Sequence, residues 1–342
     1  ALTFPLMNLG TAFSSLIAVG ASANIGIYLG QKNYPMAQKV LGNVVTLNFI
    51  IGILYMVGIM VFLDPILYFF GASANTISHA REYMQVILAG NIISHTYFAL
   101  NAVLRATGLP KMAMNASILT VLVNAVIDPL FIWLWGIRGA AIATIIAQGI
   151  SLAWVVSVLC NRNHVVHFQK GGYRLSKTIV KRILSVGMSP FFMNSTACLI
   201  VIVFNQGLKQ YGGDMAIAAY GIVNKLTFLF IMMVMGLNQG MQPIASYNFG
   251  AKRPDRVRKA LLLTMLWATL VTTVGFVVCV GFPGYVVRIF NSDPLLIEKA
   301  SWAMRVMCMF MPVIGFQLVT TNFFQSIGKV NRSIFLSLTR QV

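Results

Sequence analysis

The sequence predicts an all-helical protein that crosses a membrane many times. Hydrophobic residues make up 58% of the 342 residues and charged residues only 9%, whereas soluble domains carry about 25% charged residues. The mean hydropathy is +0.80. The apolar residues also gather in runs that are long enough to cross a bilayer, which takes about 20 residues for each helix.

These apolar runs divide the chain into membrane spans with short connections. Nine runs are long enough to be complete helices, and a tenth begins near residue 333. The longest polar stretch is 161–182, with Gly171 and Gly172 at its centre, so no soluble domain separates the spans. We expect helices near 3–28, 41–69, 83–104, 112–135, 139–160, 183–208, 216–247, 260–289 and 301–324.

Basic residues are distributed unevenly between the loops. The formal net charge of +18 could suggest a nucleic-acid partner, but the lysines and arginines stand between long apolar runs. Cytoplasmic loops of membrane proteins carry such an excess of lysine and arginine. The pattern therefore argues against nucleic-acid binding and predicts which loops face the cytoplasm. Seventeen of the 22 basic loop residues lie near 30–39, 105–111, 161–182, 250–259 and 325–332.

The sequence repeats itself weakly at an offset of 220 residues. Loop 29–39 aligns with 249–259 without a gap, and the matched glycines and lysines stand beside span boundaries. Six spans separate equivalent points, so both halves have the same orientation in the membrane. This predicts a parallel repeat of two six-helix bundles, related by a pseudo-twofold axis along the membrane normal. The identical pairs are Gly30 and Gly250, Lys32 and Lys252, Lys39 and Lys259, Phe70 and Phe290, Ala80 and Ala300, Met84 and Met304, and Gly108 and Gly328.

The repeat also predicts how the chain is divided. Residues 1–160 would form an N-lobe from spans 2–6, 161–182 a basic cytoplasmic linker, and 183–342 a C-lobe from spans 7–10 and the start of span 11. The span at 183–208 finds no partner, because its equivalent would precede residue 1. We therefore expect a fragment of a twelve-span protein, lacking the first helix and the last one to two.

One carboxylate differs from the others in its depth in the membrane. The chain has seven acidic residues, and Asp128 alone lies within a predicted span. An ionised group there costs at least about 2.5–3.5 kcal/mol, so it needs a partner, a proton, an ion or water. Asn124 lies one helical turn away on the same face, and Pro129 leaves the carbonyl of Ala125 without its helix hydrogen bond. These oxygens could form a proton or cation site. The alternative is a structural aspartate bonded to a neighbouring helix.

Further polar residues lie at membrane depth, each with two possible roles. Thr144 could reach Asp128 across the tight turn 136–139, or it could bond its own backbone. Lys225 and Arg305 would either snorkel to the interface or line a hydrated cavity. Amides and flexible thioethers would suit a cavity of loose specificity, with interhelical bonding or ordinary packing as the alternative. These possible cavity residues are Asn238, Gln239, Gln242, Met304, Met307 and Met311.

The cysteines and histidines give no sign of catalysis. Cys160, Cys198, Cys279 and Cys308 lie in or beside apolar runs without metal or redox spacing, so they are interpreted as small core residues. Among the four histidines, only His95 lies at possible membrane depth, and no acid stands three or four residues from it. We expect no enzymatic activity, no cofactor, and no metal beyond a possible Na⁺ at Asp128.

Two long segments resemble the multidrug and toxic compound extrusion (MATE) transporters. They are LRATGLPKMAMNASILTVLVNAVIDPLFIW (104–133), continued by GIRGAAIATIIAQ (136–148), and GLNQGMQPIASYNFGAK (236–252), which has the first-half counterpart GASANIGIYLGQK (20–32). The resemblance covers essentially the whole chain and is closest to prokaryotic members. It implies two six-helix lobes that form a V around a central cavity.

The resemblance also implies a function. Family members exchange H⁺ or Na⁺ for organic cations, and their N-lobe cation site matches Asn124, Asp128 and Thr144 here. The family's other key acid lies on a first helix that this chain lacks, and the acids of some C-lobes have no match in 183–208 or 301–324. We therefore expect a monomeric antiporter of the bacterial inner membrane, exporting cationic, amphiphilic drugs by alternating access. The alternative is a flippase for lipid-linked oligosaccharide precursors from the same wider superfamily.

Overall fold

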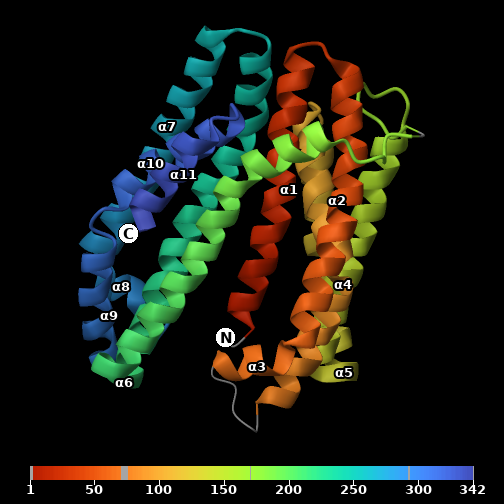
Figure 1. Ribbon diagram of the computed structural model, residues 1–342. Helices are drawn as coiled ribbons and strands as arrows, with labels where there is room; N and C mark the ends of the chain where they lie inside the picture. The colour runs from red at the N-terminus through yellow and green to blue at the C-terminus, as the bar shows by residue number, and fades with distance from the viewer. Residues whose placement is uncertain (1–2, 71–75, 170, 292, 342) are drawn as a thin grey trace. The chain divides into compact units, whose positions relative to one another are not determined.

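The computed structural model describes residues 3–70, 76–169, 171–291 and 293–341, and all regular elements in them are helical (Figure 1). Seven helices there are long and apolar enough to cross a membrane, or eight if one bent pair counts as a single span. This confirms the predicted polytopic, all-helical class. The first half contains α1 (Phe4–Gly30), α2 (Tyr34–Val61), α3 (Leu63–Phe69), α4 (Ile77–Ala106) and α5 (Pro110–Cys160). The remainder contains α6 (Lys177–Gly250), α7 (Pro254–Phe276), the π-helix η1 (Val277–Gly281), α8 (Pro283–Arg288), α9 (Pro294–Met307), α10 (Met311–Ser326) and α11 (Val330–Gln341).

Two of these elements are each a pair of helices joined by a single glycine. In α5, Gly136 has φ +57° and ψ −135°, and in α6, Gly213 has φ +63° and ψ −168°. Residues with a side chain rarely adopt such angles, which explains glycine at both turns. The turns fall between the spans predicted at 112–135 and 139–160, and between those at 183–208 and 216–247. Both predicted breaks are therefore confirmed.

Three predicted spans are interrupted, and the sequence-based boundaries there were wrong. The run 41–69 divides into α2 and α3, and 260–289 divides into α7, η1 and α8. The run 301–324 divides between α9 and α10, which meet at an angle of 49°. Pro283 and Pro312 stand at the starts of α8 and α10. Proline has no amide hydrogen to continue the preceding helix, so it favours a new helix start. Hydropathy alone does not detect such breaks.

The backbone repeats itself at the predicted offset of 220 residues. Lys32 and Lys252 are the two residues other than glycine with positive φ in the described chain, at +60° and +55°. Gly108 and Gly328 also share positive φ, at +84° and +73°. Each pair follows the C-terminal end of a helix, at matching points of the two halves. The two halves thus use the same local geometry to end equivalent helices.

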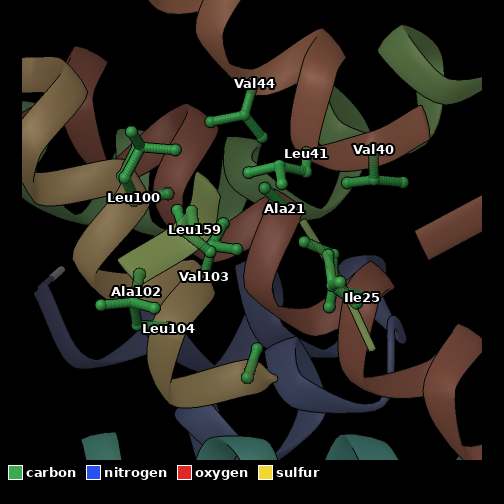
Figure 2. Close-up of a cluster of buried hydrophobic side chains, with 14 of the residues drawn as sticks. Ala21, Ile25, Val40, Leu41, Val44, Leu100, Ala102, Val103, Leu104 and Leu159 are labelled. Carbon is green, nitrogen blue, oxygen red and sulfur yellow. The ribbon is translucent and has the colours of Figure 1, made fainter. Parts of the chain in front are cut away.

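The chain forms two compact units. Unit 1 comprises Ala1–Ser195 and Ser246–Lys252, and unit 2 comprises Thr196–Ala245 and Arg253–Val342. In unit 1, α1, α2, α4 and α5 pack on one another. Figure 2 shows the core that they share, with buried side chains from each of the four helices. Labelled there are Ala21, Ile25, Val40, Leu41, Val44, Leu100, Ala102, Val103, Leu104 and Leu159.

The predicted basic linker is held against α2. Asn43 is buried and donates to the carbonyl of Arg174 at 3.1 Å, while its side-chain oxygen accepts from the amide of Ser176 at 2.9 Å. Thr46 donates to the carbonyl of Tyr173 at 2.8 Å. The linker is also shorter than expected, because α6 begins at Lys177 rather than near 183. Its backbone therefore has a fixed course on unit 1.

Unit 2 has its own apolar core. The helices α7 and α10 pack closely through small residues, since a β carbon on Gly315 would lie 2.8 Å from the carbonyl oxygen of Ala268. A second cluster joins residues of α6, η1, α8 and α9 with the first residue of α10. Close approach through small residues is typical of helix packing in membranes, where apolar burial distinguishes poorly between protein and lipid.

Candidate functional site

The candidate coupling site lies on the first half of α5, in unit 1. Asp128 and Asn124 are both half-buried and stand one turn apart on this helix. Pro129 follows within the same helix, so the carbonyl of Ala125 receives no bond from an amide four residues later. The side-chain nitrogen of Asn124 is buried and has no hydrogen-bond partner among the described residues. The helix therefore presents several polar atoms that its own structure does not satisfy.

Asp128 differs from the other two carboxylates of unit 1 in its charge environment. Asp64 accepts two bonds from Arg81, at 2.6 and 2.7 Å, and Glu82 lies 3.3 Å from Arg138. Within the described part of the chain, Asp128 makes no such ion pair. Its negative charge is left for a proton, an ion or a substrate to neutralise.

Tyr83 is a neighbour of Asp128 that sequence reasoning missed. It lies near the start of α4, and the charge of Asp128 acts electrostatically on its hydroxyl. The two residues are far apart along the chain, so no helical periodicity joins them. The signal that could have identified it is the tight turn at Gly136. That turn brings Arg138 close to Glu82, the residue before Tyr83, and so places the ends of α4 and α5 together.

A polar cluster fixes the α5 hairpin against α4 below this site. The hydroxyl of Thr120, on the first half of α5, lies 2.9 Å from the hydroxyl of Tyr97 on α4. It also lies 2.7 Å from the hydroxyl of Ser151, on the second half of α5. Ser94 of α4 bonds Gln148 in the same way. Hydrogen bonds of this kind are worth about 0.6 kcal/mol each between membrane helices, and together they fix the register of the helices that carry the site.

Thr144 has the simpler of its two predicted surroundings. Its hydroxyl donates to the carbonyl of Ala140 at 2.9 Å, within its own helix. The neighbouring residues Ala141, Ala143 and Ala147 are fully buried, as expected for a face of small residues in close packing. The half-buried Thr144 therefore lies across the hairpin from Asp128, with its hydrogen already donated to its own backbone.

The predicted cavity amides of α6 have three different environments. Asn238 is buried, and neither its side-chain oxygen nor its nitrogen has a partner among the described residues. Gln239 is exposed, and Gln242 is half-buried and takes part in an interaction. Asn238 is the one of the three whose buried polar atoms remain unsatisfied, at a cost of about 1–3 kcal/mol. Its role as cavity lining remains a prediction.

The thioethers and cations of unit 2 divide between the core and the surface. Met304 and Met311 are buried in the core cluster of unit 2, whereas Met307 is 39% exposed. The break between α9 and α10 separates Met307 from Met311, so the expected continuous helical face is not formed. Lys225 and Arg305 are both exposed. In the described chain, no three histidine, cysteine or acidic residues gather as they would to hold a metal ion.

Comparison with known proteins places this geometry in a family. The family model MatE matches residues 1–130 and 190–342. A multidrug export protein MepA from Staphylococcus haemolyticus is 24% identical over 99% of this chain and 75% of its own length. A MepA from Staphylococcus aureus strain NCTC 8325 is 26% identical over 96% of this chain and 73% of its own length.

Solved structures agree with this assignment. The MATE multidrug transporter DinF-BH, solved in complex with a bound drug, superposes with a TM-score of 0.91. It is 30% identical and is covered over 77% of its length by the whole of this chain. An outward-facing MATE family transporter gives a TM-score of 0.92 at 24% identity, which supports the fold. The sequence match, the helical membrane fold and these structures together show that the chain belongs to the MatE family of multidrug efflux transporters in the bacterial inner membrane.

Proposed function

We propose that this transporter exchanges H⁺ or Na⁺ for organic cations, and that Asp128 binds the coupling ion. The observation that carries the proposal is the half-buried carboxylate of Asp128 in a membrane helix, without an ion pair in the described chain. Such a charge is costly in the membrane until a cation reaches it. The amide oxygen of Asn124 and the carbonyl of Ala125 would supply further oxygen ligands beside it. Tyr83 supplies a hydroxyl on the facing helix.

Coupling requires that ion binding favours one conformation of the protein over another. Neutralising Asp128 removes the charge that its surroundings must otherwise solvate. Conformations that bury the site would then become more stable, and those that open it to water less so. Alternating access follows when the ion and the drug favour opposite conformations. The relatives named as multidrug exporters, and the structure of one with a bound drug, support an organic substrate for this chain as well.

The decisive variant is Asp128→Asn in the intact protein. The amide is nearly isosteric with a protonated carboxyl group, but it cannot release a proton or attract a cation. We expect normal membrane insertion, retained drug binding, and loss of efflux driven by H⁺ or Na⁺ gradients that are imposed separately in proteoliposomes. Glu298→Gln, an equivalent change at an exposed site in α9, is the matched control and should leave efflux unchanged. Wild-type efflux by Asp128→Asn at every pH and Na⁺ concentration tested would refute the role.

A flippase for lipid-linked oligosaccharide precursors is the second candidate function. The exposed cations Lys225 and Arg305 favour it, because a pyrophosphate-linked substrate carries negative charge. Replacing both residues by glutamine separates the two functions. An exporter of organic cations should keep its activity in this double variant, whereas a flippase should lose it. Movement of a labelled lipid pyrophosphate across the vesicle membrane measures the second activity directly.

A further inference from the structure

Two cysteines that are distant in the sequence meet inside unit 2. Cys279 belongs to η1, and Cys308 follows the last residue of α9. Both are free thiols, and they are 0% and 1% exposed. Their side chains share a hydrogen bond. Their spacing in the sequence gives no metal or redox motif, so the fold alone creates this pair of thiols.

The surroundings of the pair are rich in soft donor atoms. The hydroxyl of Thr227 lies 3.7 Å from the sulfur of Cys308. Met304 and Met311 are buried in the same cluster as both cysteines. Thiolate and thioether sulfur prefer soft metal ions over hard ones such as Mg²⁺ and Ca²⁺. In the described residues, no charged side chain belongs to this cluster.

Both cysteines lie where the helices are irregular. Cys279 is in a π-helical turn, a form that appears mostly as short insertions in α-helices and is frequent at functional sites. Cys308 lies at the break where α9 and α10 meet at 49°. At such positions the backbone is not held by a regular ladder of hydrogen bonds. Small adjustments can therefore bring two sulfurs onto one ion without unfolding a helix.

We propose that Cys279 and Cys308 form a dithiol site that chelates one divalent, thiophilic metal ion with linear two-coordination, of the Hg²⁺ class. Binding breaks the two S–H bonds, forms two metal–sulfur bonds and releases two protons to water. The product has two thiolates and one divalent cation, so it is neutral. Neutrality suits a buried, apolar site, where an uncompensated charge is costly. A monovalent soft ion would leave one negative charge, which disfavours Cu⁺ or Ag⁺.

The other two cysteines of the chain provide the background for a test. Cys160 is exposed at the end of α5, and Cys198 is half-buried in α6. The intact protein should carry serine in place of every cysteine except Cys279 and Cys308. Titration with HgCl₂ is followed by the ultraviolet absorption of the mercury–thiolate bonds and by mass spectrometry. Glutathione is present as a competing monothiol.

We expect one Hg²⁺ for each chain and protection of both thiols from alkylation after denaturation. Two ligands on one scaffold gain at least about 100-fold over single thiols through effective concentration. Adding Cys279→Ser or Cys308→Ser should therefore lower the apparent affinity by that factor. Two Hg²⁺ ions for each chain, or no binding, would overturn the proposal. The stoichiometry in the two-cysteine protein decides the question even if a single-cysteine variant fails to fold.

Discussion

Asp128, Asn124 and Thr144 lie on one helical hairpin, but their side chains have different surroundings. The Asn124 amide nitrogen is buried without a partner in the described chain, whereas the Thr144 hydroxyl donates to its own helix. A group that is already bonded has little free energy to gain from an ion. An unsatisfied group beside a carboxylate retains its full capacity to orient toward one. The structure therefore assigns more weight to Asn124 than to Thr144.

This difference predicts unequal effects of two substitutions. Asn124→Ala should lower ion-driven efflux about tenfold, the equivalent of one hydrogen bond of about 1.4 kcal/mol. Thr144→Val preserves the shape of the side chain and removes a hydroxyl that bonds only its own backbone in this structure. It should change efflux by less than about twofold. Initial rates in proteoliposomes at equal protein amounts measure both, and a larger loss in Thr144→Val would contradict the assignment.

The part of the site that could be predicted from sequence lies on a single helix. Asp128 and Asn124 follow from hydropathy and from the helical period, because both properties are local. Tyr83 and the pair formed by Cys279 and Cys308 depend on contacts between different helices. Such contacts follow from packing, which a single sequence does not encode in any short pattern. The same limit applies to the unsatisfied amide of Asn238.

At the scale of the elements, glycine and proline determine where the apolar runs divide. Turns that need positive φ were predictable, since Gly136 lies between two long runs. The break at 307–311 was not, because the residues around it are as apolar as the helices that it separates. The lengths of the spans thus follow from bilayer thickness, while their interruptions follow from local backbone chemistry.

Gly139 is predicted to be essential to the α5 hairpin. A β carbon at this position would collide with the carbonyl oxygen of Phe131, which the turn holds in place. Gly139→Ala should therefore destabilise the protein by about 1–3 kcal/mol, lowering its unfolding temperature by several degrees. Gly58→Ala in α2 is the matched control, since a β carbon there meets nothing within 4 Å. That control should be neutral or stabilising, because alanine favours helix more than glycine does. Thermal unfolding in detergent measures both variants, and equal effects would contradict the argument.

At the scale of the whole molecule, the repeat appears in a reciprocal contact inside unit 1. A β carbon on Gly30 would collide with the carbonyl oxygen of Tyr247, and one on Gly250 with that of Ile27. The offset of 220 residues converts the first contact into the second. Two contacts that exchange in this way are characteristic of a twofold relation between the surfaces involved. This relation is what the parallel repeat predicts.

The reciprocal contact predicts matched effects at two distant positions. Gly30→Ala and Gly250→Ala should each destabilise the protein by a similar amount, about 1–3 kcal/mol, because each introduces the same collision between two backbones. Gly236→Ala serves as the control, since a β carbon at that position of α6 meets nothing within 4 Å. Thermal unfolding gives the comparison. A large effect at one of the two contact glycines and none at the other would contradict the twofold relation.

The charges of unit 1 make a prediction about the orientation of the whole chain. Its two basic loop residues outside the five basic loops, Arg81 and Arg138, are each paired with an acid. The loops at 30–39, 105–111 and 161–182 contain no acidic residue, so their positive charge is uncompensated by neighbours in sequence. Positive charge of this kind is retained on the cytoplasmic side during insertion, and anionic lipid attracts it there.

The orientation can be tested by labelling single cysteines in intact cells. Lys177→Cys and Arg256→Cys, each in a cysteine-free protein, should resist a membrane-impermeant maleimide until the cells are opened. Both side chains are exposed in the structure, so resistance cannot come from burial. His79→Cys, at an exposed position near the start of α4, provides the opposite control and should react from outside. The connection before α4 and the loop 161–182 lie an odd number of spans apart, and so on opposite sides of the membrane. Ready labelling of Lys177→Cys together with protection of His79→Cys would show that the chain is inserted in the reverse orientation.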